Sequence, residues 1–234
     1  MKYNTVFISD VHLGTDRCNI KKFNRFLSNL QTDKLVMVGD IIDIHCLEKY
    51  NTRWRKEHTD AIHKIIELAN NGTKIIYILG NHDSTARKYV LEKSYRFRNL
   101  TICNHYTHKD AKNKKYYCIH GDMNSQYSSG SWKQYFLNWG YETITPVNNF
   151  IKKYLNVSLV SFLKKIKRGK RYIDNYEKDL ISVIDTKYHG VICGHIHHAN
   201  IRKFGELTYM CCGDWCDSNT AIAEIDGNYQ ILRF

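Results

Sequence analysis

The sequence predicts an α/β fold, in which strands alternate with helices to build a sheet. Its strand-like segments are almost continuously apolar and rich in Val, Ile and Tyr, as expected of strands buried on both faces. Amphipathic helical patterns separate the early strands. Short polar segments follow the apolar runs, at the position where ligands gather in open α/β sheets.

The apolar runs are short and bounded by polar residues or glycine, as is typical of strands. The expected strands are Thr5–Asp10, Lys34–Asp40, Lys74–Leu79, Tyr116–His120, Gly190–Cys193 and Leu207–Cys212. Two further segments, Ala221–Ile225 and Tyr229–Arg233, flank the turn sequence Asp226-Gly227-Asn228. Such a turn predicts that these two strands form a hairpin.

Two helices are expected between the early strands. Asn19–Leu30 and Arg53–Asn70 repeat apolar residues at helical spacing. Gly72 follows the second segment closely, and glycine commonly ends helices.

The segment from residue 123 to residue 173 breaks the alternation of strands and helices. It contains no clear strand, but it has three amphipathic helical pieces, Trp132–Tyr141, Val147–Tyr154 and Ser158–Lys167. Nine Lys or Arg residues and a single acidic residue lie in it, so most of the formal net charge of +12 falls there. We expect one domain over residues 1–234, with residues 123–173 inserted as a helical cap over the site.

Composition favours a folded chain without a membrane-spanning segment. Hydrophobic residues make up 43% and aromatic residues 13% of the chain, which is enough for a sizeable core. No signal peptide fits the first residues, and the apolar stretches are far shorter than the roughly 20 residues that cross a bilayer. The eight cysteines form no CxxC pair, so we expect buried free thiols that pack the core in a reducing cytoplasm.

Five short segments end an apolar run with metal-binding side chains. They are Ser9-Asp10-Val11-His12, Gly39-Asp40-Ile41-Ile42-Asp43, Gly80-Asn81-His82-Asp83, His120-Gly121-Asp122 and Gly194-His195-Ile196-His197. One of them alone would be an ordinary loop. Five of the same kind predict one polynuclear metal site that the fold assembles.

The donor atoms of these segments indicate which metals they suit. Mixed oxygen and imidazole ligands favour manganese, iron or zinc. Asp10 and His12 would share one side of an extended backbone and could hold one ion together. His195 and His197 repeat that spacing and could serve one ion or two. Asp40 follows a glycine at a strand end and is the natural bridge between two cations; an amide oxygen and a further imidazole come from Asn81 and His120.

In chain order the segments match the pattern D-x-H, G-D-x-x-D, G-N-H-D/E, H and G-H-x-H. The complete pattern resembles that of the calcineurin-like metallophosphoesterases. The resemblance implies a four-layer α-β-β-α sandwich and two divalent ions, with Mn²⁺ expected and Fe, Zn or Mg as alternatives. It implies that one ion is bound by Asp10, His12 and His197, that the other is bound by Asn81, His120 and His195, and that Asp40 bridges them.

The same resemblance implies metal-assisted hydrolysis. Two ions roughly 3.5–4 Å apart activate water and stabilise the charge that develops on phosphoryl oxygens. His82 follows Asn81 and is expected to face the leaving oxygen as a general acid or charge stabiliser. Asp83 is expected to orient the ring of His82. Asp43 and Asp122 are expected to support the metal ligands.

Three segments resemble one branch of the family in more detail, the UDP-2,3-diacylglucosamine diphosphatases. They are Ser9–Thr15, Val191–Ala199, and Gly213-Asp214-Trp215 followed by Thr220-Ala221. The branch also carries a helical insertion where this chain has residues 123–173. The resemblance implies hydrolysis of UDP-2,3-diacylglucosamine to UMP and 2,3-diacylglucosamine 1-phosphate in lipid A biosynthesis.

A nucleotide-linked lipid substrate fits the composition of the expected cap. Basic side chains there could contact the pyrophosphate or an anionic inner-membrane surface, and aromatic side chains could line a chamber for acyl chains or simply pack the cap. The expected substrate-binding residues are Asn81, Lys164, Lys167 and Arg168. We therefore expect a cytoplasmic protein with peripheral contact to the membrane.

Two other kinds of function stay open. A nuclease or a broader phosphodiesterase or phosphatase of the same family would also use a basic, aromatic-bearing surface. A non-catalytic scaffold on the same fold is the second alternative. Such a scaffold would be expected to have lost ligands, and every position of the pattern is filled here.

Overall fold

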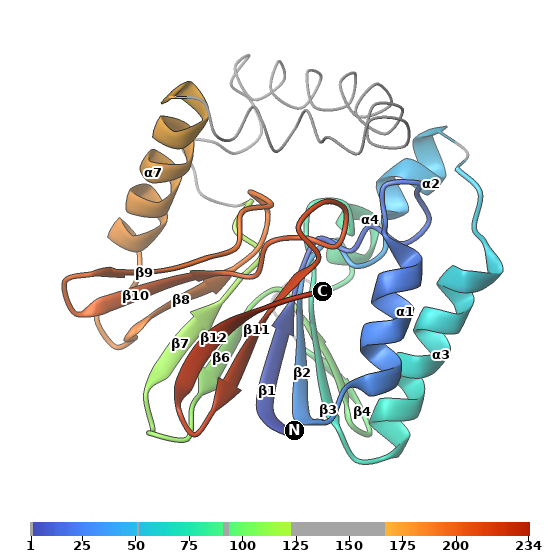
Figure 1. The fold of residues 1–234 in the computed structure, drawn as a ribbon, viewed down its shortest axis with the longest axis horizontal. Coiled ribbons are helices and arrows are strands. Elements are labelled where there is room, and N and C mark those ends of the chain that lie inside the picture. Colours follow the sequence, from blue (N-terminus) through green and yellow to red (C-terminus); the bar gives the residue numbers. More distant parts are fainter. Residues whose placement is uncertain (1, 51, 91–93, 123–166) are drawn as a thin grey trace. The chain divides into compact units, whose positions relative to one another are not determined.

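A computed structural model describes residues 2–50, 52–90, 94–122 and 167–234 of the chain. The chain divides into two compact units, one made of Met1–Gly121 and Ile184–Phe234 and the other of Asp122–Val183. The first unit carries every strand that the structure describes (Figure 1).

The strands of the first unit form two sheets. They are β1 (Tyr3–Ile8), β2 (Thr32–Val38), β3 (Lys74–Ile78), β4 (Tyr95–Phe97), β5 (Leu100–Cys103), β6 (Tyr106–Lys109), β7 (Lys115–Cys118), β8 (Gly190–Cys193), β9 (Asn200–Phe204), β10 (Leu207–Cys211), β11 (Thr220–Ile225) and β12 (Asn228–Arg233). The seven-stranded sheet has the order β12-β11-β1-β2-β3-β5-β4, and the five-stranded sheet has the order β6-β7-β8-β10-β9. The predicted hairpin is β11 and β12, which pair antiparallel.

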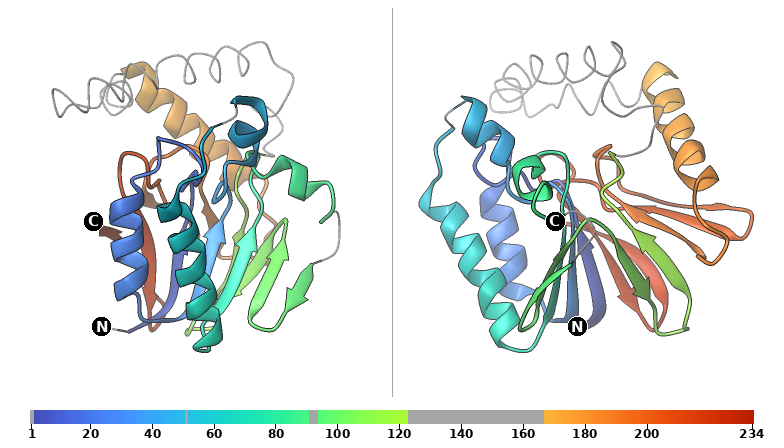
Figure 2. Two further views of the ribbon diagram at one scale, coloured as in Figure 1. Left: turned by 90° about the vertical axis from the view of Figure 1, so that its right-hand side faces the viewer. Right: turned by 180° about the vertical axis from the view of Figure 1, so that it is seen from behind.

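The helices of the first unit follow β1, β2 and β3. They are α1 (Ile20–Asn29), α2 (Ile44–Tyr50), α3 (Lys56–Asn70) and α4 (Ser84–Arg87). α1 and α3 lie against one face of the seven-stranded sheet, as Figure 2 shows. Both helices were expected from the spacing of their apolar residues, within a few residues of the observed bounds.

The core explains why the strands are almost continuously apolar. One face of the seven-stranded sheet packs on α1 and α3, where Leu35 of β2 belongs to the same buried cluster as Phe23 of α1. The opposite face packs on the five-stranded sheet, where Val36 of β2 shares a cluster with Ile192 of β8. Alternate residues of one strand thus enter two different apolar layers, which stabilises the stacked sheets. This arrangement confirms the predicted α/β fold with two sheets.

Parallel pairing places the carboxyl ends of the strands that precede the polar segments at common edges of the sheets. β1, β2 and β3 are parallel neighbours in one sheet, and β7 and β8 are parallel neighbours in the other. Parallel strands put their carboxyl ends at the same edge of a sheet. The five polar segments therefore start from two edges, one in each sheet.

Several strands end earlier than the sequence indicated. β1 ends at Ile8 and β2 at Val38, although both strands were expected to continue to an aspartate two residues later. The expectation of an extended backbone through Asp10 and His12 was therefore wrong. Both residues have a left-handed backbone, with φ of 52° and 54°, so the chain turns out of the sheet before its ligands.

The second unit covers the segment expected to form an inserted cap. Its described helix is α7 (Lys167–Ser182). The expected helical pieces Trp132–Tyr141 and Val147–Tyr154 lie outside the described residues, as does Ser158–Lys167 except for its last residue. Lys164 lies outside them too; Lys167 and Arg168 begin α7, but their side chains are outside the described part. None of the helices described is both long and apolar enough to cross a bilayer.

Candidate metal centre

The five polar segments meet because their loops are hydrogen-bonded to one another. The bonds include His12 N to Asp40 O at 3.0 Å, Gly194 N to His120 O at 3.0 Å, and His195 N to Asp10 Oδ2 at 3.0 Å. The first joins the loops after β1 and β2, and the second joins those after β7 and β8. The third connects the two sheets. Residues that are up to 185 positions apart in the sequence are therefore held together by hydrogen bonds of backbone N–H groups to carbonyl and carboxylate oxygens.

Most of the expected ligands have an unfavourable backbone conformation. Five of the seven have a positive φ: Asp10 (52°), His12 (54°), Asp40 (54°), His195 (71°) and His197 (50°). For residues other than glycine this region is sparsely populated and costs of order 1–3 kcal/mol each. Strain of this kind concentrates at functional sites, where the surrounding structure enforces it. Here it turns the side chains away from the sheets.

The first ligand set, expected to bind one ion, consists of Asp10, His12 and His197. His197 Nε2 lies 3.2 Å from Asp10 Oδ1. The rings of His12 and His197 stack with their centroids 5.4 Å apart and their planes 27° apart. The Nδ1 atom of His12 donates to Asp43 Oδ2 at 2.8 Å, which leaves Nε2 as its ligand atom. The structure thus brings all three residues together.

The second ligand set, expected to bind the other ion, consists of Asn81, His120 and His195. His120 Nδ1 donates to the carbonyl of Val38 at 2.9 Å, so the lone pair of a neutral ring is on Nε2. That atom lies 3.1 Å from Asn81 Oδ1. The ring of His195 meets the ring of His120 edge-on, with centroids 5.3 Å apart.

Asp40 lies between the two sets. Its Oδ2 atom is 3.2 Å from His120 Nε2, and ligand atoms of Asp10, Asp40 and His120 lie within 4.8 Å of one another. Gly39 makes this approach possible, because a Cβ there would collide with the ring of His120. The position of Asp40 is the one that a bridging carboxylate requires.

The chemistry of these atoms fits cations. In the second set the lone pair of His120 Nε2 faces oxygen atoms of Asn81 and Asp40, which are also acceptors, and such atoms attract one another only through a proton or a cation. Burial would raise the pKa of Asp40, but when a proton occupies His120 Nε2, the charge and hydrogen bond of that ring, with the charges of His82 and His12, hold the pKa well below its usual value. In the first set Asp10 Oδ1 is buried, makes no well-formed hydrogen bond and lies 3.2 Å from His197 Nε2. These two atoms likewise attract each other only through a proton or a cation.

Asp43 connects the first set to His82. Its carboxylate is fully buried and accepts from His12 Nδ1 and His82 Nδ1, both at 2.8 Å, and from Cys46 N at 2.9 Å. Burial lowers the pKa of His82, but its hydrogen bonds to Asp43 and Cys46 and the charges of Asp40 and Asp43 together outweigh burial and raise that pKa to about 11. The His82 side chain is 20% exposed, and Nε2 is its nitrogen left for substrate.

Asp83 does not hold His82, although it was expected to orient that ring. Its Oδ2 atom accepts from Gly80 N at 2.8 Å and Asp40 N at 2.9 Å, and its Oδ1 atom accepts from Tyr77 Oη at 2.6 Å. Burial and the charge of Asp40 raise the pKa of Asp83 to about 6, although these hydrogen bonds favour its charged form. Asp83 therefore fastens the loops after β2 and β3 together, and the orienting contact belongs to Asp43.

The remaining expected site residues are less informative. Asp122 is half-buried and opens the second unit, so its supporting role next to His120 stays a prediction. The substrate contacts expected of Lys164, Lys167 and Arg168 fall on side chains outside the described part of the chain. Asn81 lies within the second ligand set, and the substrate contact expected of it stays a prediction.

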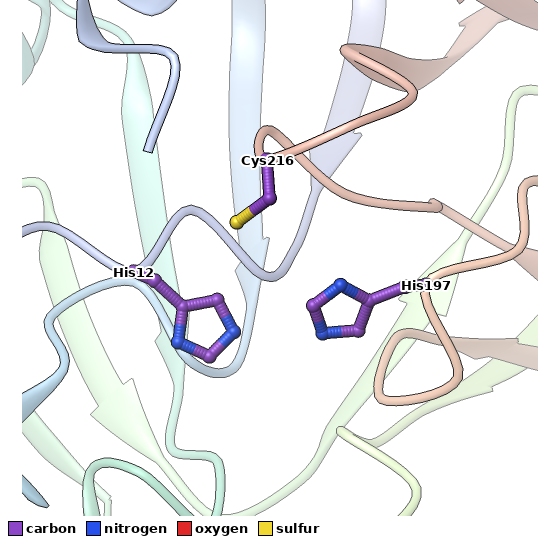
Figure 3. A group of neighbouring side chains, drawn as sticks. All are labelled: His12, His197 and Cys216. Carbon is purple, nitrogen blue, oxygen red and sulfur yellow. The ribbon is translucent and has the colours of Figure 1, made fainter. Parts of the chain in front are cut away.

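Two residues of the site were not found from the sequence. Tyr77 belongs to an apolar strand, and only the structure shows that its hydroxyl reaches Asp83. All eight cysteines are buried free thiols, as expected, and the ligand atom of one of them, Cys216, lies within 4.8 Å of those of His12 and His197 (Figure 3). No motif spacing links Cys216 to the ligands, so a sequence pattern could not have indicated it.

Comparisons with solved structures show the fold. The chain is similar to the hypothetical protein PH1004 from Pyrococcus horikoshii OT3, with a TM-score of 0.53, 10% identity, and coverage of 100% of this chain and 88% of that chain. It is also similar to YfcE, a phosphoesterase from E. coli, with a TM-score of 0.48, 11% identity, and coverage of 94% of this chain and 86% of that chain. A third similar structure is that of an archaeal phosphodiesterase, with a TM-score of 0.46, 13% identity, and coverage of 98% of this chain and 99% of that chain. A search of curated proteins found no match.

A match to a family model shows which protein family the chain belongs to. The model described as Calcineurin-like phosphoesterase matches residues 3–199, which contain all seven expected ligands. The family's members are metal-dependent hydrolases of phosphoester bonds and typically bind two divalent ions, in agreement with the two ligand sets around Asp40. The chain belongs to the calcineurin-like phosphoesterase family.

Proposed function

We propose that this protein hydrolyses the pyrophosphate bond of UDP-2,3-diacylglucosamine and releases UMP and 2,3-diacylglucosamine 1-phosphate. The hydrolytic part of the proposal depends on one observation, the convergence of two ligand sets on Asp40. Such a pair of divalent ions, when bound, activates a water molecule and stabilises charge on the phosphoryl oxygens. Asp10, His12, His197 and Asp40 would hold one ion, and Asn81, His120, His195 and Asp40 the other.

The protein's own residues orient the remaining groups. Asp43 fixes the Nδ1–H tautomer of His12 and also accepts from Nδ1 of His82. Because the pKa of His82 is raised to about 11, its ring is protonated, and this imidazolium can present its second proton, on Nε2, to the oxygen that leaves phosphorus. Asp40 Oδ1 accepts from the backbone N of His82 at 2.9 Å, so the proton donor and the bridging carboxylate are mutually positioned. An acid that protonates the leaving oxygen must be held at a fixed position relative to the metal ligands, and this hydrogen bond holds His82 in that way.

The choice of substrate is supported by sequence resemblance. Ser9–Thr15, Val191–Ala199 and the Gly213-Asp214-Trp215 segment match the diacylglucosamine branch in residues that surround the ligands. Two of the three segments contain ligands, and the third is fastened to the first, because Trp215 N donates to Asp10 O at 3.0 Å.

The charge of residues 123–173 suits a membrane-bound anionic substrate. Each basic residue near an anionic membrane surface contributes about 1 kcal/mol to attraction. Nine Lys or Arg residues in this segment would therefore bring the protein to the inner face of the membrane, where a nucleotide-linked lipid presents its head group. Peripheral binding is part of the proposal.

The test is to incubate the full chain with Mn²⁺ and UDP-2,3-diacylglucosamine and to identify products by mass spectrometry. We expect UMP and 2,3-diacylglucosamine 1-phosphate, and no product after chelation. Asp40→Asn is the inactive control, and Asp33→Asn, at a carboxylate that is 60% exposed, is the matched active control. Hydrolysis of a chromogenic diester without turnover of the lipid would contradict the proposed substrate but would still support phosphoesterase activity. Salt-sensitive cleavage of DNA in its place would favour a nuclease.

A further inference from the structure

A sulfur atom stands among the ligands of the first set. Ligand atoms of His12, His197 and Cys216 lie within 4.8 Å of one another, and Figure 3 shows the sulfur turned toward the side on which both rings lie. We propose that the Cys216 thiolate is a further ligand of the ion held by Asp10, His12 and His197. The thiolate would make this ion site selective for Zn²⁺ or Fe²⁺ over Mn²⁺. The inference rests on the proposed dinuclear centre and adds a donor to it.

The two imidazoles offer their nitrogens to the same place as the sulfur. Asp43 occupies Nδ1 of His12, so Nε2 is the nitrogen left for an ion. His197 Nε2 points to Asp10 Oδ1 at 3.2 Å, and the rings of His12 and His197 are stacked. Imidazole nitrogen, carboxylate oxygen and thiolate sulfur are the donors that zinc combines in proteins.

Asp10 supplies an independent indication of an ion at this place. Asp10 is fully buried, its Oδ2 atom accepts from His195 N, and its Oδ1 atom makes no well-formed hydrogen bond although His197 Nε2 lies only 3.2 Å away. A buried carboxylate oxygen and an imidazole nitrogen this close to each other need a proton or a cation between them.

The backbone that carries Cys216 is held rigidly against the loop of Asp10. Trp215 N donates to Asp10 O at 3.0 Å, and Cys216 Sγ lies 3.9 Å from the same carbonyl oxygen. Cys216 N donates to Asp214 Oδ1 at 2.8 Å. The Trp215 ring is fully buried and packs against Phe23, with centroids 5.0 Å apart. Such fixed placement lowers the entropy that a ligand loses when it binds an ion.

The surroundings of Cys216 differ from those of cysteines that pack the core. Cys118 and Cys212 belong to the apolar cluster between the two sheets. Cys216 is buried beside two histidines and the backbone carbonyl of Asp10. As the ion binds, the thiol proton leaves to solvent and a sulfur–metal bond forms. A thiolate is a soft ligand, which suits zinc and iron better than manganese or magnesium.

The decisive measurement is X-ray absorption at the metal edge of the full, zinc-loaded protein. We expect a sulfur neighbour at about 2.3 Å. Loading with Co²⁺ gives a second readout, because cobalt bound to a thiolate shows a sulfur-to-metal charge-transfer band in the near ultraviolet. That band should disappear in Cys216→Ser and persist in Cys18→Ser, a matched control whose side chain is equally buried at 8% exposed.

Competition between metals tests the selectivity. Loss of the thiolate should weaken zinc binding by roughly 10–100-fold, as changes around a metal commonly do, and should weaken manganese binding much less. Circular dichroism of the metal-free Cys216→Ser variant confirms that it is folded. Two bound ions without a sulfur neighbour, and a cobalt spectrum unchanged in Cys216→Ser, would overturn the role of Cys216 and leave the proposed hydrolase intact. Failure to bind any ion would overturn both.

Discussion

The two ligand sets share Asp40 but differ in the donors around it. The first set combines a carboxylate, two imidazoles and the nearby thiol of Cys216, whereas the second adds the amide oxygen of Asn81 and no sulfur among the clusters that the described residues form. Oxygen donors suit manganese and magnesium, and softer donors suit zinc and iron. With Cys216 as the proposed ligand, one carboxylate would join two sites of different metal preference, and the two ions would not need to be the same.

The largest effect is expected at the residue that the two sets share. Asp40→Asn removes the charge that would bridge the ions, so both sites should weaken and turnover of a phosphodiester should fall by at least about 10³-fold. Metal analysis after desalting and steady-state kinetics measure the two effects. Asp33→Asn should leave both unchanged. Retention of two ions with substantial turnover in Asp40→Asn would contradict the shared-ligand arrangement.

The next largest effect separates the two sets. His120→Ala removes a ligand from the second set alone, and Asp40 still faces Asp10 of the first set. We expect the metal content to fall from two ions to one and turnover to fall by about 10³-fold, because both ions act on the phosphoryl oxygens. In zinc- and manganese-loaded samples the retained ion should be the one that the first set prefers. Loss of both ions would show that the sets do not fill independently.

The positions of these ligands could be predicted because each follows a recognisable strand. Apolar runs identified β1, β2, β3, β7 and β8, and parallel pairing puts their carboxyl ends at common edges. The sequence did not show how the chain leaves those strands. Asp10 and His12 were expected on extended backbone, but positive φ values turn them. That conformation is imposed by contacts with distant segments, such as the bond from His195 N to Asp10, which local sequence does not encode.

Residues that act through others were the harder part to predict. Asp43 was expected to support ligands, but its simultaneous contact with His12 and His82 depends on how the loop after β2 bends. Asp83 is adjacent to His82 in sequence, which suggested contact between their side chains. Consecutive side chains in a tight loop point in different directions, so the carboxylate of Asp83 meets Tyr77 and backbone N–H groups instead. Cys216 reaches the first set from a loop after β10 that no metal motif marks.

A smaller effect is expected where a residue serves chemistry without holding an ion. His82→Ala should lower turnover by about 10²–10³-fold, because it removes the candidate proton donor. Metal content should stay at two ions, since His82 meets the sets through Asp43, through its backbone bond to Asp40 and through an edge-on ring contact with His12, and Asp43 occupies its Nδ1 atom. His63→Ala, at an exposed histidine of α3, is the control. A loss of metal in His82→Ala would mean that His82 is a metal ligand and that the assignment of residues to the two sets is wrong.

The smallest effect is expected at Tyr77, which supports the second set from a distance. Its hydroxyl donates to Asp83 Oδ1 at 2.6 Å, and Asp83 in turn binds the backbone N of Gly80 and of Asp40. Tyr77→Phe keeps the ring and removes this bond to a charged group, which should lower the free energy of unfolding by about 1.5–3 kcal/mol. Denaturant unfolding measures that loss. Manganese affinity should fall by less than about tenfold, since the loops after β2 and β3 keep their other bonds.

Tyr3→Phe, at a half-buried tyrosine at the start of β1, controls for loss of a phenol elsewhere in the same sheet. If Tyr77→Phe weakened zinc binding at the first set as much as manganese binding at the second, Tyr77 would support both ligand sets. That result would contradict the claim that the two sets bind their ions independently.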